Sequence, residues 1–432
     1  MSSSSGSSIS SPSSNGARLV IKAGLLIDGN GGQARDQVVV VNGRNIEGVY
    51  PLNPFQPRPD DKVIDAAQYT VMPGLIDCHV HTRSTGDPRD QRTAYTTSVP
   101  DFAYRSLRNA QKDLEAGYTT LRDMASINYV DVALRDAIER GDFKGPRLRV
   151  SGWGLTQWGG HMHRFMRPGL DMVESKGVVN NPGEAQSAAR YNIGRGVDGL
   201  KFNTGGGVLD DNGKMVIHQE MDYAMLRAAV KEAEKVGAWT ATHCHGGQGA
   251  TDAILAGVFS IEHGHWLTDE QFAQMLERGT IFVPTLCANE NRYRLGPAAV
   301  DHDEKAWRWL EIVMEDKTDT VKKAMKAGVP VAAGSDAGMV HTYHGECARE
   351  MEYLVRRAMT PMQAIVASTK TAAMATKLDH KTGTLDAGKW ADVIVVKGNP
   401  LDDISILTDK NNILLVMKDG KVMVERGPKL AA

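Results

Sequence analysis

Between residues 71 and 335 the chain repeats one pattern eight times: a short apolar run rich in β-branched residues, then a stretch long enough to hold a helix. The apolar runs cover residues 71–77, 118–123, 148–154, 199–203, 239–244, 259–263, 281–286 and 329–335. Stretches at 101–116, 219–236, 269–278 and 304–327 are plausible helices. This alternation predicts an α/β fold of the TIM-barrel class, (β/α)8. A doubly wound open sheet is the alternative that the same pattern allows.

The two ends of the chain carry a different pattern. Residues 17–72 and 381–432 contain apolar runs joined by Asn-Gly and Asp-Gly pairs, which are typical of β-hairpins. Because neither end has enough strands to bury a core alone, we expect both ends to pair in one small β-sandwich. The barrel, residues 73–380, would be inserted between them. The Ser-rich residues 1–16 cannot form a core, and we expect a flexible tail there.

The charges of the chain are nearly balanced, with 50 basic and 52 acidic residues and a net charge of -2. This balance gives no electrostatic footprint for nucleic acid or for an anionic membrane surface. No run reaches the roughly 18 apolar residues needed to span a bilayer. We therefore expect neither a nucleic-acid nor a membrane partner. The start resembles no secretion signal, so the sequence as written predicts a cytoplasmic protein, or a periplasmic or secreted one if a native leader was removed.

The histidines are more clustered than chance predicts. Thirteen are present, and eight of them form four His-x-His pairs near the carboxyl ends of predicted strands: His79/His81, His161/His163, His243/His245 and His263/His265. Residues i and i+2 of a strand point to one face, so a pair can present two imidazoles to one metal ion. In a barrel, those strand ends form the active site. Hydrogen bonding explains a single pair equally well, but four pairs around one mouth favour metal binding.

Two further residues fit a metal centre. Asp336 follows the eighth apolar run, where a carboxylate could bind metal and accept a proton. Lys201 ends the fourth run, a place where a lone lysine usually forms a salt bridge or extends to solvent. Its position among the histidine-bearing strands favours carboxylation by carbon dioxide, which gives an anionic carbamate able to bridge two cations. Partial burial and nearby cations lower a lysine pKa and supply the neutral amine that this reaction needs.

The segments PGLIDCHVHT, THCHG, IEHGH and GSDAG, together with the isolated Lys201, resemble the amidohydrolase superfamily in order and spacing. The resemblance covers nearly the whole chain, including TGTLDAGKWADVIVVKGNPLDDI, which is similar to the closing β-sandwich segment of that superfamily. The GGH at 159–161, the His-Cys-His-Gly at 243–246 and the early STGDP segment resemble the prolidase-like and dipeptidase branch. That branch includes bacterial ochratoxin-degrading amidohydrolases.

The resemblance implies a centre of two divalent metal ions, most often zinc, joined by a carbamate on Lys201. It implies that the first metal is held by His79, His81 and Asp336, and the second by His243 and His263. Substrate contacts are implied for Ser84, His161, His245 and His344, while His265 would support the site and His163 has no assigned role. One departure is the segment NTGGGVL after Lys201, which is longer by a glycine than the expected form.

The implied reaction is the hydrolysis of an amide bond, with the metals activating water and Asp336 moving its proton to the leaving nitrogen. No cysteine nucleophile is needed. The chain's four cysteines are expected to be free and buried, and Cys78 and Cys244 should point away from the site.

The expected substrate is a small molecule with an amide bond and a free carboxylate, from which a C-terminal amino acid is released. The closer likeness suggests ochratoxin A, giving ochratoxin alpha and phenylalanine. The alternatives are an Xaa-Pro or other dipeptidase, a mononuclear deaminase-type amidohydrolase and an inactive scaffold. Members of the group often assemble, so we expect a homo-oligomer, an octamer among the options.

Overall fold

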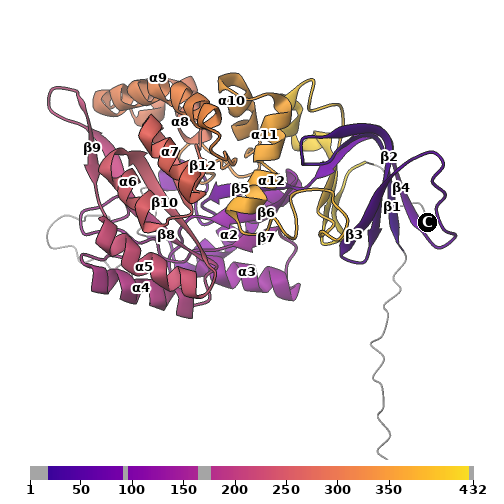
Figure 1. Cartoon of the computed structure of the whole chain (residues 1–432), viewed down its shortest axis with the longest axis horizontal. Coiled ribbons are helices and arrows are strands. Elements are labelled where there is room, and N and C mark those ends of the chain that lie inside the picture. Colours follow the sequence, from indigo (N-terminus) through magenta and orange to yellow (C-terminus); the bar gives the residue numbers. More distant parts are fainter. Residues whose placement is uncertain (1–17, 91–95, 164–176, 428–432) are drawn as a thin grey trace, which may run out of the picture.

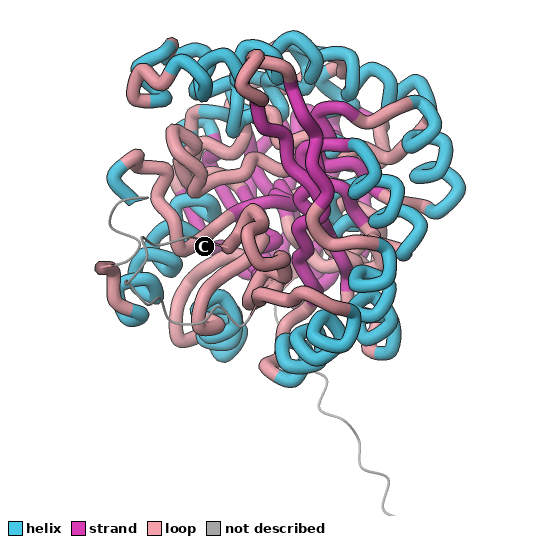
Figure 2. The backbone as a smooth tube through the Cα atoms, turned by 90° about the vertical axis from the view of Figure 1, so that its left-hand side faces the viewer, coloured by secondary structure: helices cyan, strands magenta, loops and turns pink. Residues whose placement is uncertain are grey.

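The computed structural model describes residues 18–90, 96–163 and 177–427 of the chain. An α/β body, with strands inside and helices around them, carries a β-sheet unit at one end (Figure 1). Figure 2, seen from the side away from that unit, shows strands in the centre with helices along the outside. The Ser-rich residues 1–16 lie outside the described residues. None of the described helices combines the length and the apolar composition that crossing a membrane requires.

Two sheets form the interior of the body, and their neighbouring strands are parallel except for β9. The first consists of β5 (Leu75–Val80), β6 (Tyr118–Asp123) and β7 (Arg147–Arg149). The second consists of β8 (Gly199–Leu209), β9 (Met215–Gln219), β10 (Trp239–Gly246), β11 (Ser260–Trp266) and β12 (Ile281–Val283). Almost every side chain of β5, β6, β10 and β11 is buried. This double-sided burial explains why the sequence shows continuous apolar runs there.

Backbone hydrogen bonds of 2.8–3.0 Å connect the two sheets on both sides. They join Leu155 N to Lys201 O, Ala332 N to Phe282 O, and Cys78 N to Ala333 O. The segment after β7 thus meets β8, and the eighth apolar run, 329–335, lies between β12 and β5. These contacts follow the strand order that a closed eight-stranded barrel requires.

Helices separate the strands along the chain and cover the sheets from outside (Figure 2). They are α2 (Val99–Glu115), α3 (Val130–Arg140), α4 (Pro182–Gly194), α5 (Tyr223–Lys235), α6 (Gly247–Ala256), α7 (Asp269–Arg278), α8 (Cys287–Leu295), α9 (Glu304–Ala327), α10 (Arg349–Arg357), α11 (Pro361–Ala367) and α12 (Lys370–Ala375). The predicted helices 269–278 and 304–327 match α7 and α9 in full. The one predicted at 219–236 begins later, because β9 extends to Gln219 and Asp222 caps α5.

The predicted strand at 71–77 is divided in the structure. Its first residues end β4 (Lys62–Pro73), its last ones begin β5, and Gly74 lies between the two. A Cβ atom at Gly74 would lie 2.4 Å from the side chain of Thr119, so the close approach of this turn to β6 requires glycine. The predicted strand at 329–335 keeps its place in the sheet order but makes only isolated bridge contacts.

Both ends of the chain meet in one seven-stranded sheet, in the order β15-β14-β13-β4-β1-β2-β3. The N-terminal strands are β1 (Leu19–Ile27), β2 (Gln33–Asn42), β3 (Asn45–Pro51) and β4; the C-terminal strands are β13 (Val393–Val396), β14 (Ile413–Lys418) and β15 (Lys421–Glu425). The two sets join where β4 pairs antiparallel with β13. Buried residues from both ends share one apolar cluster. The predicted pairing of the chain ends is present, and its hydrogen bonding is that of one continuous sheet.

Candidate active site

One cavity of about 400 Å³ collects the side chains that the sequence singled out. The strands β5, β8, β10 and β11 contribute to its wall, together with the segment that follows the eighth apolar run. All six residues predicted as metal ligands line it: His79, His81, Lys201, His243, His263 and Asp336. Residues separated by more than 250 positions in the sequence are thus brought to one place.

His79, His81 and Asp336 form the tightest group in this cavity. The Nε2 atoms of His79 and His81 lie 3.5 Å and 3.1 Å from Oδ1 of Asp336. The three potential ligand atoms all lie within 4.8 Å of one another. Asp336 has a backbone φ of 61°, an unusual value for a residue with a side chain, and one that commonly marks functional sites.

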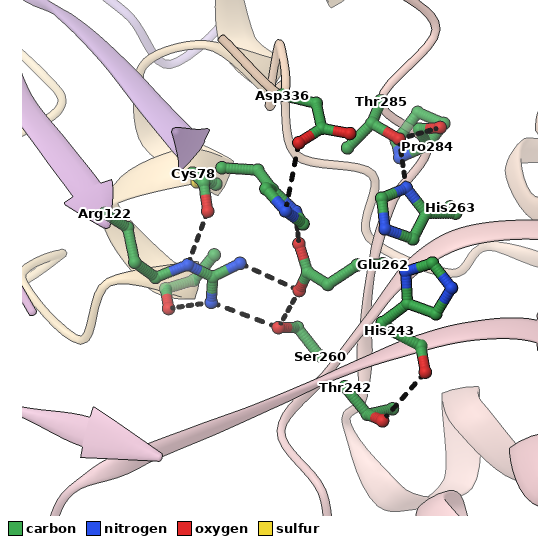
Figure 3. A network of polar contacts seen from close by, with 12 residues as sticks. Cys78, Arg122, Thr242, His243, Ser260, Glu262, His263, Pro284, Thr285 and Asp336 are labelled. Carbon is green, nitrogen blue, oxygen red and sulfur yellow. Dashed lines mark hydrogen bonds and ion pairs between the residues drawn. The ribbon is translucent and has the colours of Figure 1, made fainter. Parts of the chain in front are cut away.

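Glu262, Arg122 and Ser260 form a buried network (Figure 3), which fixes the orientation of the His79 ring. Nδ1 of His79 lies 2.8 Å from Oε2 of Glu262, and the other oxygen of Glu262 accepts hydrogen bonds from Arg122 at 2.9 Å and Ser260 at 2.5 Å. An ionised Glu262 can only accept, so Nδ1 of His79 carries the proton. The lone pair of His79 is therefore on Nε2, the atom that faces Asp336.

His263 is oriented in the same way by a hydroxyl group. Its Nδ1 lies 2.6 Å from Oγ1 of Thr285, whose own proton goes to the carbonyl oxygen of Pro284 at 2.8 Å (Figure 3). Because that hydroxyl must then accept from Nδ1, the lone pair of His263 lies on Nε2. In the described part of the chain, the buried Nε2 of His243 has no hydrogen-bond partner. Three imidazole nitrogens are thus free to act as ligands.

The electrostatics of the cavity favour neutral imidazoles. Burial lowers the pKa of His79, His243 and His263 well below the usual value of histidine, and neighbouring positive groups lower it further. Burial also lowers the pKa of Lys201 to about 8. For Asp336, burial alone would raise the pKa, but His79, His81 and Lys201 outweigh it and lower the pKa. The cavity therefore combines neutral imidazoles, an easily neutralised amine and the carboxylate of Asp336, with a second carboxylate, Glu220, in its wall.

The predicted substrate residues divide into two groups. His161 and His245 line the cavity, and the ring of His161 stacks on His243 with centroids 3.8 Å apart. Ser84 and His344 are not among the residues that line it. His344 is buried: its Nδ1 lies 2.7 Å from Oδ2 of Asp113, and its Nε2 lies 3.2 Å from the carbonyl oxygen of His81. The observed contacts of His344 thus position the backbone of a cavity residue.

Ser84 lies in the same supporting layer as His344. Its backbone N–H donates to the carbonyl oxygen of His81 at 2.9 Å, and its own carbonyl accepts from Asn109. His163 lies in the loop after β7, where the Gly159 N–H donates to its ring and Trp158 lies against it. His265 lines the cavity, and Nδ2 of Asn289 lies 3.3 Å from its Nε2. The same-face argument for His-x-His pairs therefore fails for the pair 161/163, which is not on a strand.

The glycine-rich segment after Lys201 forms a hairpin, β8 with β9, that the sequence did not predict. Its glycines pack against ring systems: a Cβ at Gly206 would lie 2.8 Å from His218, and one at Gly207 would lie 2.7 Å from Trp266. The segment NTGGGVL thus continues a strand that borders the cavity.

Several cavity residues were not predicted. Glu220, Asn289, Arg292 and Trp309 line it, and Glu262 and Arg122 support it from behind. Glu262 had one available signal, its place beside His263 in a strand. The positive φ of His263, 72°, breaks the regular alternation at that point and hides the relation. The residues of α8 and α9 carry no comparable signal, because their helices reach the cavity only through tertiary packing.

The two predicted features of the cysteines are present. All four are free and buried. Cys78 packs in an apolar cluster and its thiol donates to the carbonyl of Ala372 at 3.5 Å, so it faces away from the cavity. Cys244 lies in the main apolar core and does not line the cavity either.

The comparisons with known proteins agree with these features. A family model described as amidohydrolase family matches residues 70–423. The ochratoxinase of Aspergillus niger is 31% identical over 95% of this chain and 87% of that protein. A solved Xaa-Pro dipeptidase with bound methionine in its active site has a TM-score of 0.83 at 32% identity, covering 94% of this chain and 99% of that chain. The solved A. niger ochratoxinase has a TM-score of 0.81 at 27% identity, covering 95% and 96%.

These likenesses extend over nearly the whole chain and include both the α/β body and the end sheet. The relatives named above are hydrolases by their descriptions. The resemblance inferred from the histidine-bearing segments and Asp336 is therefore confirmed. This chain belongs to the amidohydrolase family.

Proposed function

We propose that this chain is a binuclear metal-dependent hydrolase of amide bonds that releases a C-terminal amino acid from an N-acyl or dipeptide-like substrate. The observation that carries the proposal is the cavity itself, into which four imidazoles, two of them oriented by hydrogen bonds, converge with a carboxylate and a buried lysine. Nitrogen and carboxylate donors in this combination suit divalent transition metals, zinc above all.

The donor set fits two ions. His79, His81 and Asp336 would hold the first, and their ligand atoms already lie within 4.8 Å of one another. His243 and His263 would hold the second. The ring protons of His79 and His263 are held on the side away from the cavity, which is the arrangement found in metal-binding histidines.

Lys201 would join the two sites as a carbamate. With a pKa lowered to about 8 by burial, about a tenth of its amine is neutral at pH 7, far more than for an ordinary lysine. The amine nitrogen attacks carbon dioxide, a C–N bond forms and one proton leaves, which turns a buried cation into an anion. Two adjacent cations would need such an anion, because neutral imidazoles do not offset their charge.

Two bound cations would lower the pKa of the attacking water and polarise the scissile carbonyl as Lewis acids. The remaining steps fall to the chain. Asp336, held ionised by its neighbours, accepts a proton as the water oxygen attacks the carbonyl carbon. It then returns the proton to the nitrogen as the C–N bond breaks. The products are a carboxylic acid and a free amine.

For the substrate, the likeness to ochratoxinase favours an N-acyl aromatic amino acid, with ochratoxin A giving ochratoxin alpha and phenylalanine. The wall of the cavity includes Trp309, compatible with an aromatic ligand. A second candidate is an Xaa-Pro or other dipeptidase, favoured by the solved dipeptidase at 32% identity.

The architecture follows the same proposal. We infer a closed (β/α)8 barrel over residues 73–380, completed by a small unit from residues 17–72 and 381–432. The hydrogen bonds across both gaps between the sheets support closure. A homo-oligomer, such as an octamer, stays a prediction.

The test is a panel of amides, with ochratoxin A, N-acyl amino acids and Xaa-Pro dipeptides, assayed before and after chelation. We expect hydrolysis that is lost with the chelator and recovered with added zinc. Activity that is indifferent to complete removal of metal would overturn the proposal. The rank order of kcat/KM within the panel decides between an aromatic N-acyl substrate and an Xaa-Pro dipeptide.

The carbamate is tested separately with Lys201→Ala. We expect this variant to lose activity and to recover part of it when a short-chain carboxylic acid is added to replace the bridging anion. Full activity of the variant without such an acid would refute the carbamate.

A further inference from the structure

The arginine Arg292 stands out among the residues that line the cavity. It lies on α8, which also contributes Ala288 and Asn289 to the wall. Its guanidinium is held by its own helix: Nε donates to the carbonyl oxygen of Ala288 at 2.8 Å, and Nη2 donates to Oδ1 of Asn289. Two of its three nitrogens therefore have neutral partners, and the position of the group is fixed.

No carboxylate of the described residues forms an ion pair with Arg292, and its Nη1 has no hydrogen-bond partner among them. Its neighbourhood makes this unusual. Arg357, which also packs beside α8, forms an ion pair with Glu290, and the buried Arg122 forms one with Glu262. Asp336, the carboxylate that acts on Arg292 electrostatically, interacts instead with His79 and His81.

The guanidinium of Arg292 lies half-buried in the cavity wall with no carboxylate partner, and partial removal of an unpaired charge from water is costly for the folded protein. Burial also lowers the pKa of Arg292, which is a sign of this cost, although the group stays charged. Such a group is tolerated where a ligand supplies the missing anion, and a planar guanidinium matches a carboxylate with two parallel hydrogen bonds. The volume of the cavity, about 400 Å³, suits a ligand of the size of an acylated amino acid.

We propose that Arg292 binds the free carboxylate of the amino acid on the leaving side of the amide and so selects substrates with a C-terminal carboxylate. The inference rests on the proposed function, because it takes the metal-binding residues as the place where the amide is cleaved. The imidazoles and Asp336 then fix one end of the substrate, and Arg292 fixes the other. A substrate that lacks the carboxylate would leave this guanidinium unpaired in the complex.

The experiment compares two amides that differ only in the carboxylate: N-benzoyl-L-phenylalanine and N-benzoyl-2-phenylethylamine. The metal-loaded enzyme is assayed as wild type, as Arg292→Met and as Arg292→Lys. The control is Arg294→Met, an exposed arginine on the same helix that does not line the cavity. Binding of both compounds is measured by calorimetry alongside kcat and KM.

We expect Arg292→Met to lower kcat/KM for the acid about 10- to 100-fold, mainly through KM, and to leave the decarboxylated amide within about threefold. Arg292→Lys should restore part of the loss, and Arg294→Met should match wild type. Because methionine removes a charge that has no ion-pair partner in the free enzyme, the melting temperature of Arg292→Met should stay unchanged or rise. A purely structural arginine would lower it.

Equal losses for both compounds, or no loss for the acid, would overturn the assignment. So would a wild-type enzyme that binds the decarboxylated amide as tightly as the acid, or that binds neither. If wild type binds the acid through Arg292 but cleaves no amide, the proposed reaction fails while the role of Arg292 stands. The calorimetric comparison thus separates the two failures.

Discussion

Two buried ion-pair networks of similar geometry lie in different parts of this molecule. Behind the cavity, Arg122 pairs with Glu262 at 2.9 Å, and Glu262 binds the ring of His79. At the junction of the body with the seven-stranded sheet, Arg147 of β7 pairs with Asp392 and Asp419, each at 2.7 Å. The pairs Arg122–Glu262 and Arg147–Asp392 are buried, whereas Asp419 is partly exposed, so each buried pair is costly to disrupt.

The two networks differ in what lies at their ends. The first ends on the imidazole of His79, whose Nε2 lies 3.5 Å from Oδ1 of Asp336, and both residues line the cavity. The second makes only structural contacts: Asp392 also accepts from the Thr382 hydroxyl at 2.8 Å and from the Asp419 N–H at 2.9 Å, Trp390 lies against Arg147, and Asp419 pairs with the exposed side chain of Arg44. Burial and ion pairing alone therefore do not mark a functional residue. A functional residue is marked by the contacts at the end of its network.

The largest effect is expected at Asp336, which interacts with His79 at the end of the cavity network and is the proposed proton acceptor. Asp336→Asn keeps the size of the side chain but removes the proton acceptor, so kcat should fall about 10²- to 10⁴-fold. The measurement is steady-state kinetics on the best substrate of the panel, with circular dichroism to confirm folding. A folded variant with kcat within about tenfold of wild type would remove Asp336 from proton transfer.

A smaller effect is expected for Glu262→Gln, which weakens the orientation of His79 without touching the cavity. We expect metal affinity or kcat/KM to fall about 10- to 100-fold, together with a lower melting temperature. Chelator titration and thermal unfolding measure the two quantities. If stability falls while metal affinity stays at the wild-type value, the network behind His79 is as purely structural as the one at the junction.

The matching change in the junction network is Asp392→Asn. It leaves Arg147 with a weakened partner in a buried place, and we expect a loss of about 3 kcal/mol in the free energy of unfolding. Below the melting temperature, kcat/KM and metal affinity should stay within about twofold of wild type. Denaturant unfolding and kinetics test this. A folded variant that has lost its metal would show that the junction network also supports the metal site, and the proposed difference between the two networks would be wrong.

The smallest effects are expected at the cysteines beside the histidines. Cys78→Ala and Cys244→Ala remove buried atoms that face away from the cavity, so each should cost about 1 kcal/mol of stability and leave kcat almost unchanged. Collapse of activity in metal-loaded Cys244→Ala would show that the strand does not orient its side chains as described.

The sequence was sufficient for the parts of the fold that depend on local periodicity. The helices α7 and α9 and the pairing of the two chain ends were predicted. The apolar strands were predicted because burial on both faces of a parallel sheet leaves continuous apolar runs. The His-x-His pairs, together with Lys201 and Asp336 at the ends of runs, gave the candidates, and the family resemblance selected the six proposed metal-binding residues among them. These six line one cavity.

The features that could not be predicted from the sequence depend on contacts between distant segments. The hairpin after Lys201 looked like a loop, since its glycines are explained only by the rings of His218 and Trp266 that pack against them. Arg292 looked like any arginine on a polar helix, because its missing ion pair becomes visible only when its neighbours are known. His344 was predicted to contact substrate, yet its ring lies between Asp113 and the backbone of His81.

The most direct test of the central claim is the metal content of the purified protein, measured by mass spectrometry for wild type, His243→Ala and Lys201→Ala. We expect about two equivalents of divalent metal per chain in wild type, about one in His243→Ala, and weakened retention of both in Lys201→Ala. Wild-type protein that is active with less than about one equivalent of metal per chain would contradict the account.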